Sequence, residues 1–410
     1  MGVCGNGIVE AGEACDDGNT VVGDACSDCK LPGTPVWTQT YNGSNGTGDS
    51  WLGVKTDPSG NVIVAGVRFV GQSSDAVVAK YDANGNQLWV QTYNGGSNGD
   101  DAAYGVTTDA QGNIIAVGYE TSPGYDIDNK NIWIRKYDPN GNPLWTKTYV
   151  GYDTLSVYDE DDIGYGVATN AAGDVFITTT IGYDGASGDF DILVAKLSGT
   201  NGSILWNDVL DTANDDEGSA ITVDAAGRVI AAGYTVTSAG GTDMWIRKYQ
   251  DGGSSNTILW TKTYDDAAHG NDFAFGVTAD ASNNVVVVGA EPVNGQFDAS
   301  IRKYDANGNL LWTQRHAGAA GQIDLAAGVA CDAAGNIYVG GSEETANATA
   351  NTWTAKYTPA GAIVWSDVYN GSGNGDDYAN GVAVDANGYV YAAGYATEQT
   401  EVAWLRKYVP

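Results

Sequence analysis

Hydrophobic and polar positions alternate in short runs along most of the chain, and one run recurs seven times. Its first copy spans 53–66 and reads Gly-Val-Lys-Thr-Asp-Pro-Ser-Gly-Asn-Val-Ile-Val-Ala-Gly. Later copies begin at Gly105, Gly166, Ala220, Gly276, Gly328 and Gly381. Alternation over about four to eight residues between Gly- and Asn-rich turns is typical of β-strands. The first repeat therefore predicts strands at 51–57, 61–69, 75–81 and 87–93.

A tight turn joins the first two strands of each repeat. Its first copy is Asp57-Pro-Ser-Gly-Asn61, in which Gly60 needs a positive φ angle. Glycine recurs at this place at Gly112, Gly173, Gly227, Gly335 and Gly388. Repeat five has Asn283 instead, and Asn is the other residue that tolerates this conformation. The exception therefore supports the predicted geometry.

The two ends of the repeat region predict a closed ring. The last repeat stops at Pro410, after its third strand, whereas 35–41 is a fourth strand without a repeat of its own. Trp37 and Trp89 lie 52 residues apart, which is close to the average repeat length of about 54 residues over 34–410. If 35–41 completes the last repeat, no sheet edge is left bare at the seam. We therefore predict an all-β fold, a seven-bladed β-propeller closed by an N-terminal strand.

The turns and second strands carry a resemblance to a known family. Residues 60–66 (Gly-Asn-Val-Ile-Val-Ala-Gly) and 335–341 (Gly-Asn-Ile-Tyr-Val-Gly-Gly) resemble the repeats of the bacterial seven-bladed β-propeller repeat family. The resemblance covers nearly all of 34–410. It implies the fold and says little about function.

Four of the five cysteines, Cys4, Cys15, Cys26 and Cys29, fall within 26 residues and mark a small module at 1–33. Disulfides are favoured over zinc because there is one CxxC pair and no nearby histidine. A segment this short needs such cross-links, which implies an oxidising compartment. We expect two disulfides of open connectivity, and a buried free thiol at Cys331. Residues 4–29 resemble the Myxococcus-type cysteine-rich repeat, which implies a secreted or cell-surface protein.

The composition excludes several classes of function. Lys and Arg number 19 and Asp and Glu 51, which gives a net charge of −32. Such a chain repels nucleic-acid phosphates and anionic membranes, but attracts cations and basic partners. The aromatic content of 10% argues against disorder. No run approaches the roughly 20 apolar residues that a membrane-spanning helix needs, so we expect no membrane insertion.

Two acidic segments are candidate Ca²⁺ sites, because Ca²⁺ needs six to eight oxygen ligands. The first consists of Asp16, Asp17, Asn19 and Asp24 in a Gly-rich loop. These residues are equally typical of Asx-turns that shape a tight loop. The second is the run Asp159, Glu160, Asp161 and Asp162. The alternative there is a solvated acidic loop that favours solubility.

An aspartate precedes the first strand of every repeat, and we expect these seven residues to form an acidic ring at the mouth of the central channel. Two interpretations stay open, a ligand site on the axis and a structural set that accepts backbone hydrogen bonds and ties blade to blade. The set is Asp49, Asp101, Asp162, Asp216, Asp272, Asp324 and Asp377.

A second acidic or amide set precedes the third strand, at Asp75, Asn131, Asp191, Asp243, Asp298 and Asn351. Both sets should share one face of the propeller with the long loops 119–131, 148–162 and 182–191. Irregular loops on a rigid scaffold commonly carry binding. The opposite face should hold the tight turns, with repeated Lys and Asp residues that we interpret as structural pairs.

The sequence contains few signals of catalysis. His269 and His316 are its only histidines and lie in different repeats, and the sialidase Asp-box is absent. We predict a non-enzymatic extracellular or cell-surface binding or adhesion module that acts through the long-loop face. Its partner would be a protein or glycan ligand, or copies of itself. The alternatives are a building block of a surface layer, sheath or filament, which five Asn-x-Ser/Thr sequons allow, and a carbohydrate-active enzyme that uses paired carboxylates.

Overall fold

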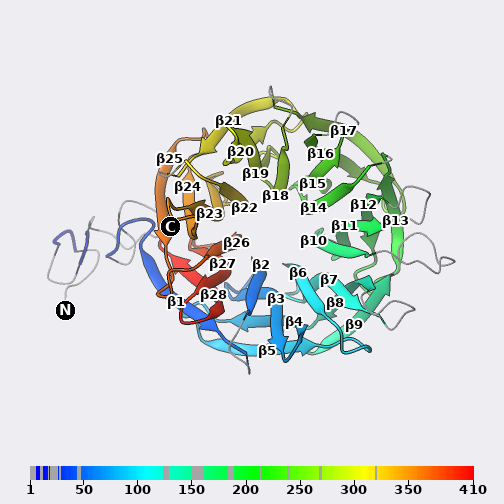
Figure 1. Ribbon diagram of the computed structural model, residues 1–410, viewed down its shortest axis with the longest axis horizontal. Helices are drawn as coiled ribbons and strands as arrows, with labels where there is room; N and C mark the ends of the chain where they lie inside the picture. The colour runs from blue at the N-terminus through cyan, green and yellow to red at the C-terminus, as the bar shows by residue number, and fades with distance from the viewer. Residues whose placement is uncertain are drawn as a thin grey trace.

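The computed structural model confirms the predicted fold, a seven-bladed β-propeller in which each blade is one four-stranded antiparallel sheet (Figure 1). It describes residues 6–9, 13–16, 18, 26, 29–43, 48–122, 129–149, 161–182, 189–212, 214–237, 241–266, 270–318 and 321–410. No helix of the described residues is long and apolar enough to cross a membrane.

The strands of blades 1 to 6 follow one another along the chain from the inner to the outer position. Blade 1 consists of β2 (Ser50–Thr56), β3 (Val62–Val70), β4 (Ser73–Tyr81) and β5 (Gln87–Tyr93). Blade 2 consists of β6 (Asp101–Thr108), β7 (Ile114–Thr121), β8 (Lys130–Tyr137) and β9 (Pro143–Tyr149). Blade 3 consists of β10 (Ile163–Thr169), β11 (Val175–Gly182), β12 (Phe190–Leu197) and β13 (Ile204–Leu210).

The remaining blades repeat this order, except for the last. Blade 4 consists of β14 (Asp216–Val223), β15 (Arg228–Val236), β16 (Thr242–Asp251) and β17 (Asn256–Tyr264). Blade 5 consists of β18 (Phe273–Ala279), β19 (Val285–Val293), β20 (Gln296–Tyr304) and β21 (Leu310–His316). Blade 6 consists of β22 (Asp324–Cys331), β23 (Ile337–Glu344), β24 (Ala350–Tyr357) and β25 (Ile363–Tyr369). Blade 7 consists of β26 (Tyr378–Val384), β27 (Val390–Thr397), β28 (Glu401–Tyr408) and β1 (Pro35–Tyr41).

The first and last strands of the chain close the ring, as predicted. β1 pairs antiparallel with β28 and forms the outer edge of blade 7 (Figure 1). Beyond the strands, the Gly33 N–H donates to the Val409 carbonyl at 3.0 Å, and the Val409 N–H donates to the Thr34 carbonyl at 2.9 Å. The two chain ends thus take the place of the turn that joins the outer strands of the other blades.

The predicted tight turns have a consistent hydrogen-bond pattern. In the first turn, one Asp57 carboxylate oxygen accepts from the N–H groups of Ser59 and Asn61, each at 2.9 Å. Gly60 has φ +80°, and Asn283 in repeat five has φ +63°, as its position requires. The aspartate therefore fixes the turn, and the Gly or Asn three residues after it permits the positive φ angle that the turn requires.

The hydrophobic core lies between blades. One cluster joins Val64 and Val77 of blade 1 to Ala393 and Leu405 of blade 7, across the seam of the ring. The inner strands approach each other closely, and a Cβ on Gly53 would lie 2.8 Å from the Tyr104 carbonyl oxygen of blade 2. The glycine that starts every core unit except the one at Ala220 therefore allows the close contact between inner strands.

The cysteine predictions are met in part. Cys15 and Cys26 form a disulfide, and Cys29 is disulfide-bonded as well. Cys4 lies outside the described residues. Cys331 carries a free thiol, as predicted, but it is partly rather than fully buried.

Candidate ligand-binding face

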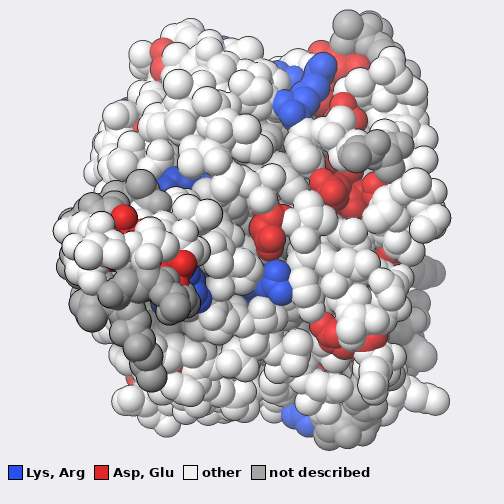
Figure 2. Space-filling model, turned by 90° about the vertical axis from the view of Figure 1, so that its left-hand side faces the viewer, with Lys and Arg blue, Asp and Glu red and all other residues white. Residues whose placement is uncertain are grey.

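The two faces of the propeller differ in how their charges are compensated. We call the face with the turns between the first and second and between the third and fourth strands the turn face. The opposite face, which carries the connections between blades and the loops between second and third strands, is the loop face. In the side view of Figure 2, Asp and Glu gather toward one face of the disc, and Lys and Arg are scattered.

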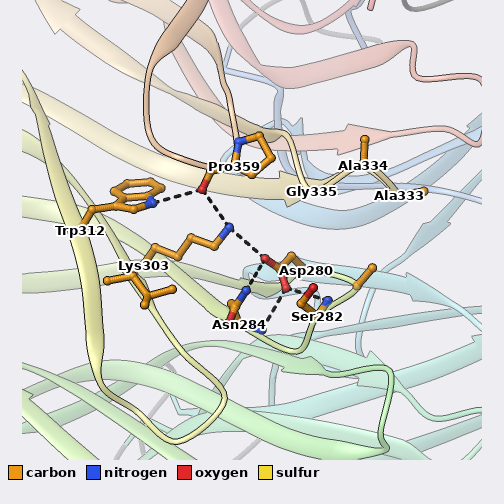
Figure 3. Close-up of a pocket in the computed structure, with 11 residues that line it drawn as sticks. Asp280, Ser282, Asn284, Lys303, Trp312, Ala333, Ala334, Gly335 and Pro359 are labelled. Carbon is orange, nitrogen blue, oxygen red and sulfur yellow. Dashed lines mark hydrogen bonds and ion pairs between the residues drawn. The ribbon is translucent and has the colours of Figure 1, made fainter.

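The turn face contains a repeated contact between neighbouring blades. In blade 5 the Lys303 ammonium pairs with Asp280 at 2.9 Å and donates to the Pro359 carbonyl of blade 6 at 3.1 Å. The Trp312 indole N–H donates to the same carbonyl at 3.2 Å (Figure 3). These residues line a hollow of about 290 Å³ between the two blades. Because its polar groups already bind one another, this hollow is a structural junction.

The same pairing recurs around the ring, which supports the structural interpretation of the Lys and Asp sets. Equivalent ion pairs of 2.9 Å are Lys80–Asp57, Lys136–Asp109 and Lys248–Asp224. In blade 3, where Asn170 takes the place of the aspartate, Lys196 pairs instead with Asp174 at 3.0 Å. Burial by itself raises the pKa of Asp280, but hydrogen bonds from Lys303 and Asn284 outweigh it and leave this pKa lowered. The pKa values of Asp57 and Asp109 are lowered in the same way.

The seven aspartates of the predicted acidic ring are buried and do not line an open channel mouth. Each is at most 1% exposed: Asp49, Asp101, Asp162, Asp216, Asp272, Asp324 and Asp377. Asp101 accepts from the Gly95 N–H at 2.6 Å and from the Thr121 N–H at 3.1 Å. Gly95 belongs to the connection from blade 1, and Thr121 to the second strand of blade 2. The carboxylate thus fixes the crossover between blades, as the structural interpretation expects.

Hydrogen bonds do not fully compensate these loop-face carboxylates. Burial raises the pKa of Asp101 to about 6, although the bonds from Gly95 and Thr121 lower it. Burial likewise raises the pKa of Asp216 to about 6 and that of Asp272 to about 6. The direction is opposite to that of the turn-face aspartates, because there hydrogen bonds from Asn and Lys side chains outweigh burial, whereas here burial is the larger effect.

The second acidic set contributes a cluster between blades 3 and 4. Asp191, at the start of β12, is 2% exposed, and one of its oxygens has no hydrogen-bond partner among the described residues. Burial, together with the charges of Asp211, Asp189 and Asp216, raises its pKa to about 7. The other members of the set are Asp75 and Asn131, which are buried, and Asp243, Asp298 and Asn351, which are partly buried.

The two predicted Ca²⁺ segments are described only in part. Asp16 accepts from the N–H groups of Asn6 at 3.1 Å, Gly7 at 2.8 Å and Gly18 at 2.8 Å. These contacts are those of a residue that shapes a loop. Asp17, Asn19 and Asp24 lie outside the described residues.

In the second segment, Asp159 and Glu160 lie outside the described residues. The Lys130 ammonium pairs with Asp161 at 2.7 Å, and the Gly182 N–H donates to Asp162 at 3.1 Å. Asp161 and Asp162 therefore each have a partner among the described residues. The central parts of the long loops 119–131, 148–162 and 182–191 are likewise outside the described residues.

Sequence reasoning missed one acidic group, Asp265, Asp266 and Asp272, whose carboxylate oxygens lie within 4.8 Å of one another. The first two follow directly on the outer strand of blade 4, where blades 1 and 6 have Asn-Gly. A comparison of the repeats at this place, residue by residue, would have found the additional charges.

Comparisons with known proteins support the fold. No family model matches the chain, and no curated protein matches its sequence. Drosophila plexin A in complex with semaphorin 1b is similar, with a TM-score of 0.53, 8% identity, and coverage of 92% of this chain and 87% of that one. The polysaccharide lyase Uly1 has a TM-score of 0.53, 12% identity, and coverage of 90% and 92%. A protein of unknown function from Dyadobacter fermentans has a TM-score of 0.52, 11% identity, and coverage of 92% and 100%. At these identities the likenesses show the fold alone, and the two family resemblances stay predictions.

Proposed function

We propose that this protein is a non-enzymatic binding module that recognises the basic side chains of a protein partner through its loop face. The observation that carries the proposal is the opposite behaviour of aspartates on the two faces. On the turn face, hydrogen bonds from asparagine and lysine side chains outweigh burial and lower the pKa values of Asp57, Asp109 and Asp280. On the loop face, burial raises those of Asp101 and Asp191. A partner that brings Lys or Arg would add positive charge beside the exposed aspartates of this face.

The wider chemistry of the chain supports the same proposal. A net charge of −32 favours rapid encounter with a basic partner. The Cys15–Cys26 disulfide supports an oxidising location, such as the outside of the cell. The likeness to plexin A, whose structure contains semaphorin, supplies the fold alone, so the proposal rests on the charges.

Exposed aspartates of the loop face allow a test that spares the fold. Asp100, Asp215 and Asp376 accept from the N–H groups of Ser74, Phe190 and Ala350 in the preceding blade. In blade 5 this contact is made by Asn271, which accepts from the Thr242 N–H at 3.1 Å. An Asp→Asn change at these places therefore keeps the contact and removes only charge.

The experiment compares two triple variants by their binding to a lysine decapeptide at fixed ionic strength. D100N/D215N/D376N changes the loop face, and D82N/D138N/D305N changes the turn face, so each reduces the net charge from −32 to −29. At about 0.5 kcal/mol for each ion pair, the loop-face variant should bind roughly tenfold more weakly than the wild type. The turn-face variant should stay close to the wild type. An equal loss in both variants would mean that only net charge matters, and would overturn the proposal.

A further inference from the structure

Among the described residues, two aspartates of the ring, Asp216 and Asp272, have a buried carboxylate oxygen without a hydrogen-bond partner, and for Asp272 the cause is visible in the sequence. In blades 2, 6 and 7 the carboxylate accepts from two N–H groups, six residues before it and twenty residues after it. The second donor is Thr121 for Asp101, Glu344 for Asp324 and Thr397 for Asp377.

In blade 5 the residue twenty positions after Asp272 is Pro292, which has no N–H. One Asp272 oxygen accepts from the Asp266 N–H at 2.9 Å. The other is buried and has no hydrogen-bond partner among the described residues. Asp272 as a whole is 0% exposed. An unpartnered carboxylate oxygen at such a place is costly unless another group neutralises it.

The surroundings of Asp272 add negative charge. Its carboxylate lies with those of Asp265 and Asp266 in a group whose oxygens are within 4.8 Å of one another. Asp266 is buried at 9% exposure, whereas Asp265 is exposed to solvent. The group is therefore buried at Asp266 and Asp272 and accessible to solvent at Asp265.

The arginine whose charge acts on Asp272 already has other partners. The Arg302 guanidinium pairs with Glu291 at 2.6 Å and lies over the Tyr264 ring at 3.2 Å from its centre. Its charge lowers the pKa of Asp272, but burial is the larger effect, and this pKa is raised to about 6. Arg302 therefore does not offset the effect of burial on Asp272.

We propose that Asp265, Asp266 and Asp272 form a Ca²⁺ site at the connection from blade 4 to blade 5. Ca²⁺ takes carboxylate oxygens in a flexible geometry and completes its shell with water, which the exposed side at Asp265 admits. Mg²⁺ demands near-ideal octahedral geometry and gives up its water reluctantly, so a partly buried group of three carboxylates suits it less. The ion would take the place of the hydrogen bond that Pro292 cannot donate, and would join the end of β17 to the start of β18.

Equilibrium dialysis of the full chain with Ca²⁺ at pH 7.5 tests the site. The readout is the number of ions bound by each variant, so that ions bound elsewhere on the chain cancel. D265N, which changes an exposed side chain, and D272N should each bind one Ca²⁺ fewer per chain than the wild type. D324N is the matched control, because both oxygens of Asp324 already have N–H donors in blade 6. It should bind the same number as the wild type.

A substitution at position 292 tests the cause. P292V restores the N–H that the other blades have, and it should weaken Ca²⁺ binding at this site about tenfold, the effect of roughly 1.4 kcal/mol. Equal Ca²⁺ stoichiometry in the wild type, D265N and D272N would overturn the proposal, and so would a wild type that binds no Ca²⁺. D265N decides the matter even if D272N or P292V folds poorly. These measurements do not involve the lysine decapeptide, so they test the Ca²⁺ site independently of the proposed binding of a basic partner.

Discussion

Gly33 packs against the ring of Trp365, and a Cβ on Gly33 would lie 2.7 Å from the Trp365 Cδ2 atom. The same contact occurs between the ordinary blades 5 and 6, where a Cβ on Gly361 would lie 3.1 Å from the Cδ2 atom of Trp312. Gly361 belongs to the turn before the outer strand of blade 6. Gly33, just before β1, therefore does in the closing blade what a turn glycine does in the others.

Substitution of Gly33 should weaken the closure of the ring. In G33A the added methyl group overlaps the Trp365 ring at φ +78°. We expect a loss of about 2–4 kcal/mol in unfolding free energy, from overpacking and a disfavoured backbone angle. G71A is the control, since Gly71 has φ +72° and open space around its Cβ, so it should lose only about 1 kcal/mol. Urea denaturation measures both, and equal losses would show that the contact with Trp365 has no effect.

Deletion of the closing strand should destabilise the whole propeller. A chain that begins at residue 31 keeps β1, whereas one that begins at 43 exposes the edge of β28. It also loses the Trp37 indole N–H bond to the Ala83 carbonyl, at 3.1 Å, between blades 7 and 1. The shorter chain should melt lower by on the order of 10 °C and associate through its bare edge.

A synthetic peptide of residues 31–42 supplies the control for that deletion. Added to the shorter chain, it should pair with β28, raise the melting temperature and reduce association in size-exclusion chromatography. If the two truncated chains melt at the same temperature, β1 is dispensable for closure.

Much of the fold could be predicted from the sequence because the repeats sample the same geometry seven times. The unpaired strand at 35–41 and the exception at Asn283 were both predictable, since each is a departure from a known pattern. The burial of Asp101 or Asp191 could not be predicted. It depends on connections from the neighbouring blade, such as the one with Asp211 and Asp216, which the spacing within one repeat does not reveal. Pro292 could be read from the sequence, but its effect could not, because only the structure shows that this position donates an N–H to the ring aspartate in other blades.

Loss of Lys303 should cost more stability than loss of Lys248. Both lysines are buried in ion pairs of 2.9 Å, with Asp280 and Asp224. K303M leaves the buried Asp280 without a cationic partner, and we expect a loss of about 3–5 kcal/mol. In K248M, Asp224 keeps the Arg228 guanidinium at 2.8 Å, so the loss should be less than half as large.

Urea denaturation at pH 7 compares these two lysine variants. The difference in unfolding free energy between K303M and the wild type should shrink in acid. The pKa of Asp280 is lowered in the folded wild type, so its ion pair stabilises the protein above the pKa of the unfolded aspartate. This stabilisation is lost as the pH falls through the pKa of the folded state. A larger loss in K248M than in K303M would contradict the prediction.

The acidic cluster at Asp191 should make the protein less stable as pH rises from about 5 to 8. Its folded pKa is raised to about 7, mainly by burial and then by Asp211, Asp189 and Asp216. An unfolded aspartate has a pKa of about 3.9, so between these values the folded state binds the additional proton. Because stability falls with pH wherever the folded state binds more protons, Asp191 lowers the unfolding free energy progressively up to pH 7 and fully above it.

D191N keeps the shape of the Asp191 side chain without its charge. This variant should flatten this part of the pH profile and be the more stable protein at pH 8. Unfolding free energies of both proteins in chelator at pH 5.5, 6.5, 7.5 and 8 decide the matter. D75N, at the equivalent place in blade 1, should change the profile in the same direction, because burial also raises the pKa of Asp75. A D191N profile parallel to that of the wild type would mean that Asp191 is already ionised in the folded protein and that the cluster tolerates its full charge.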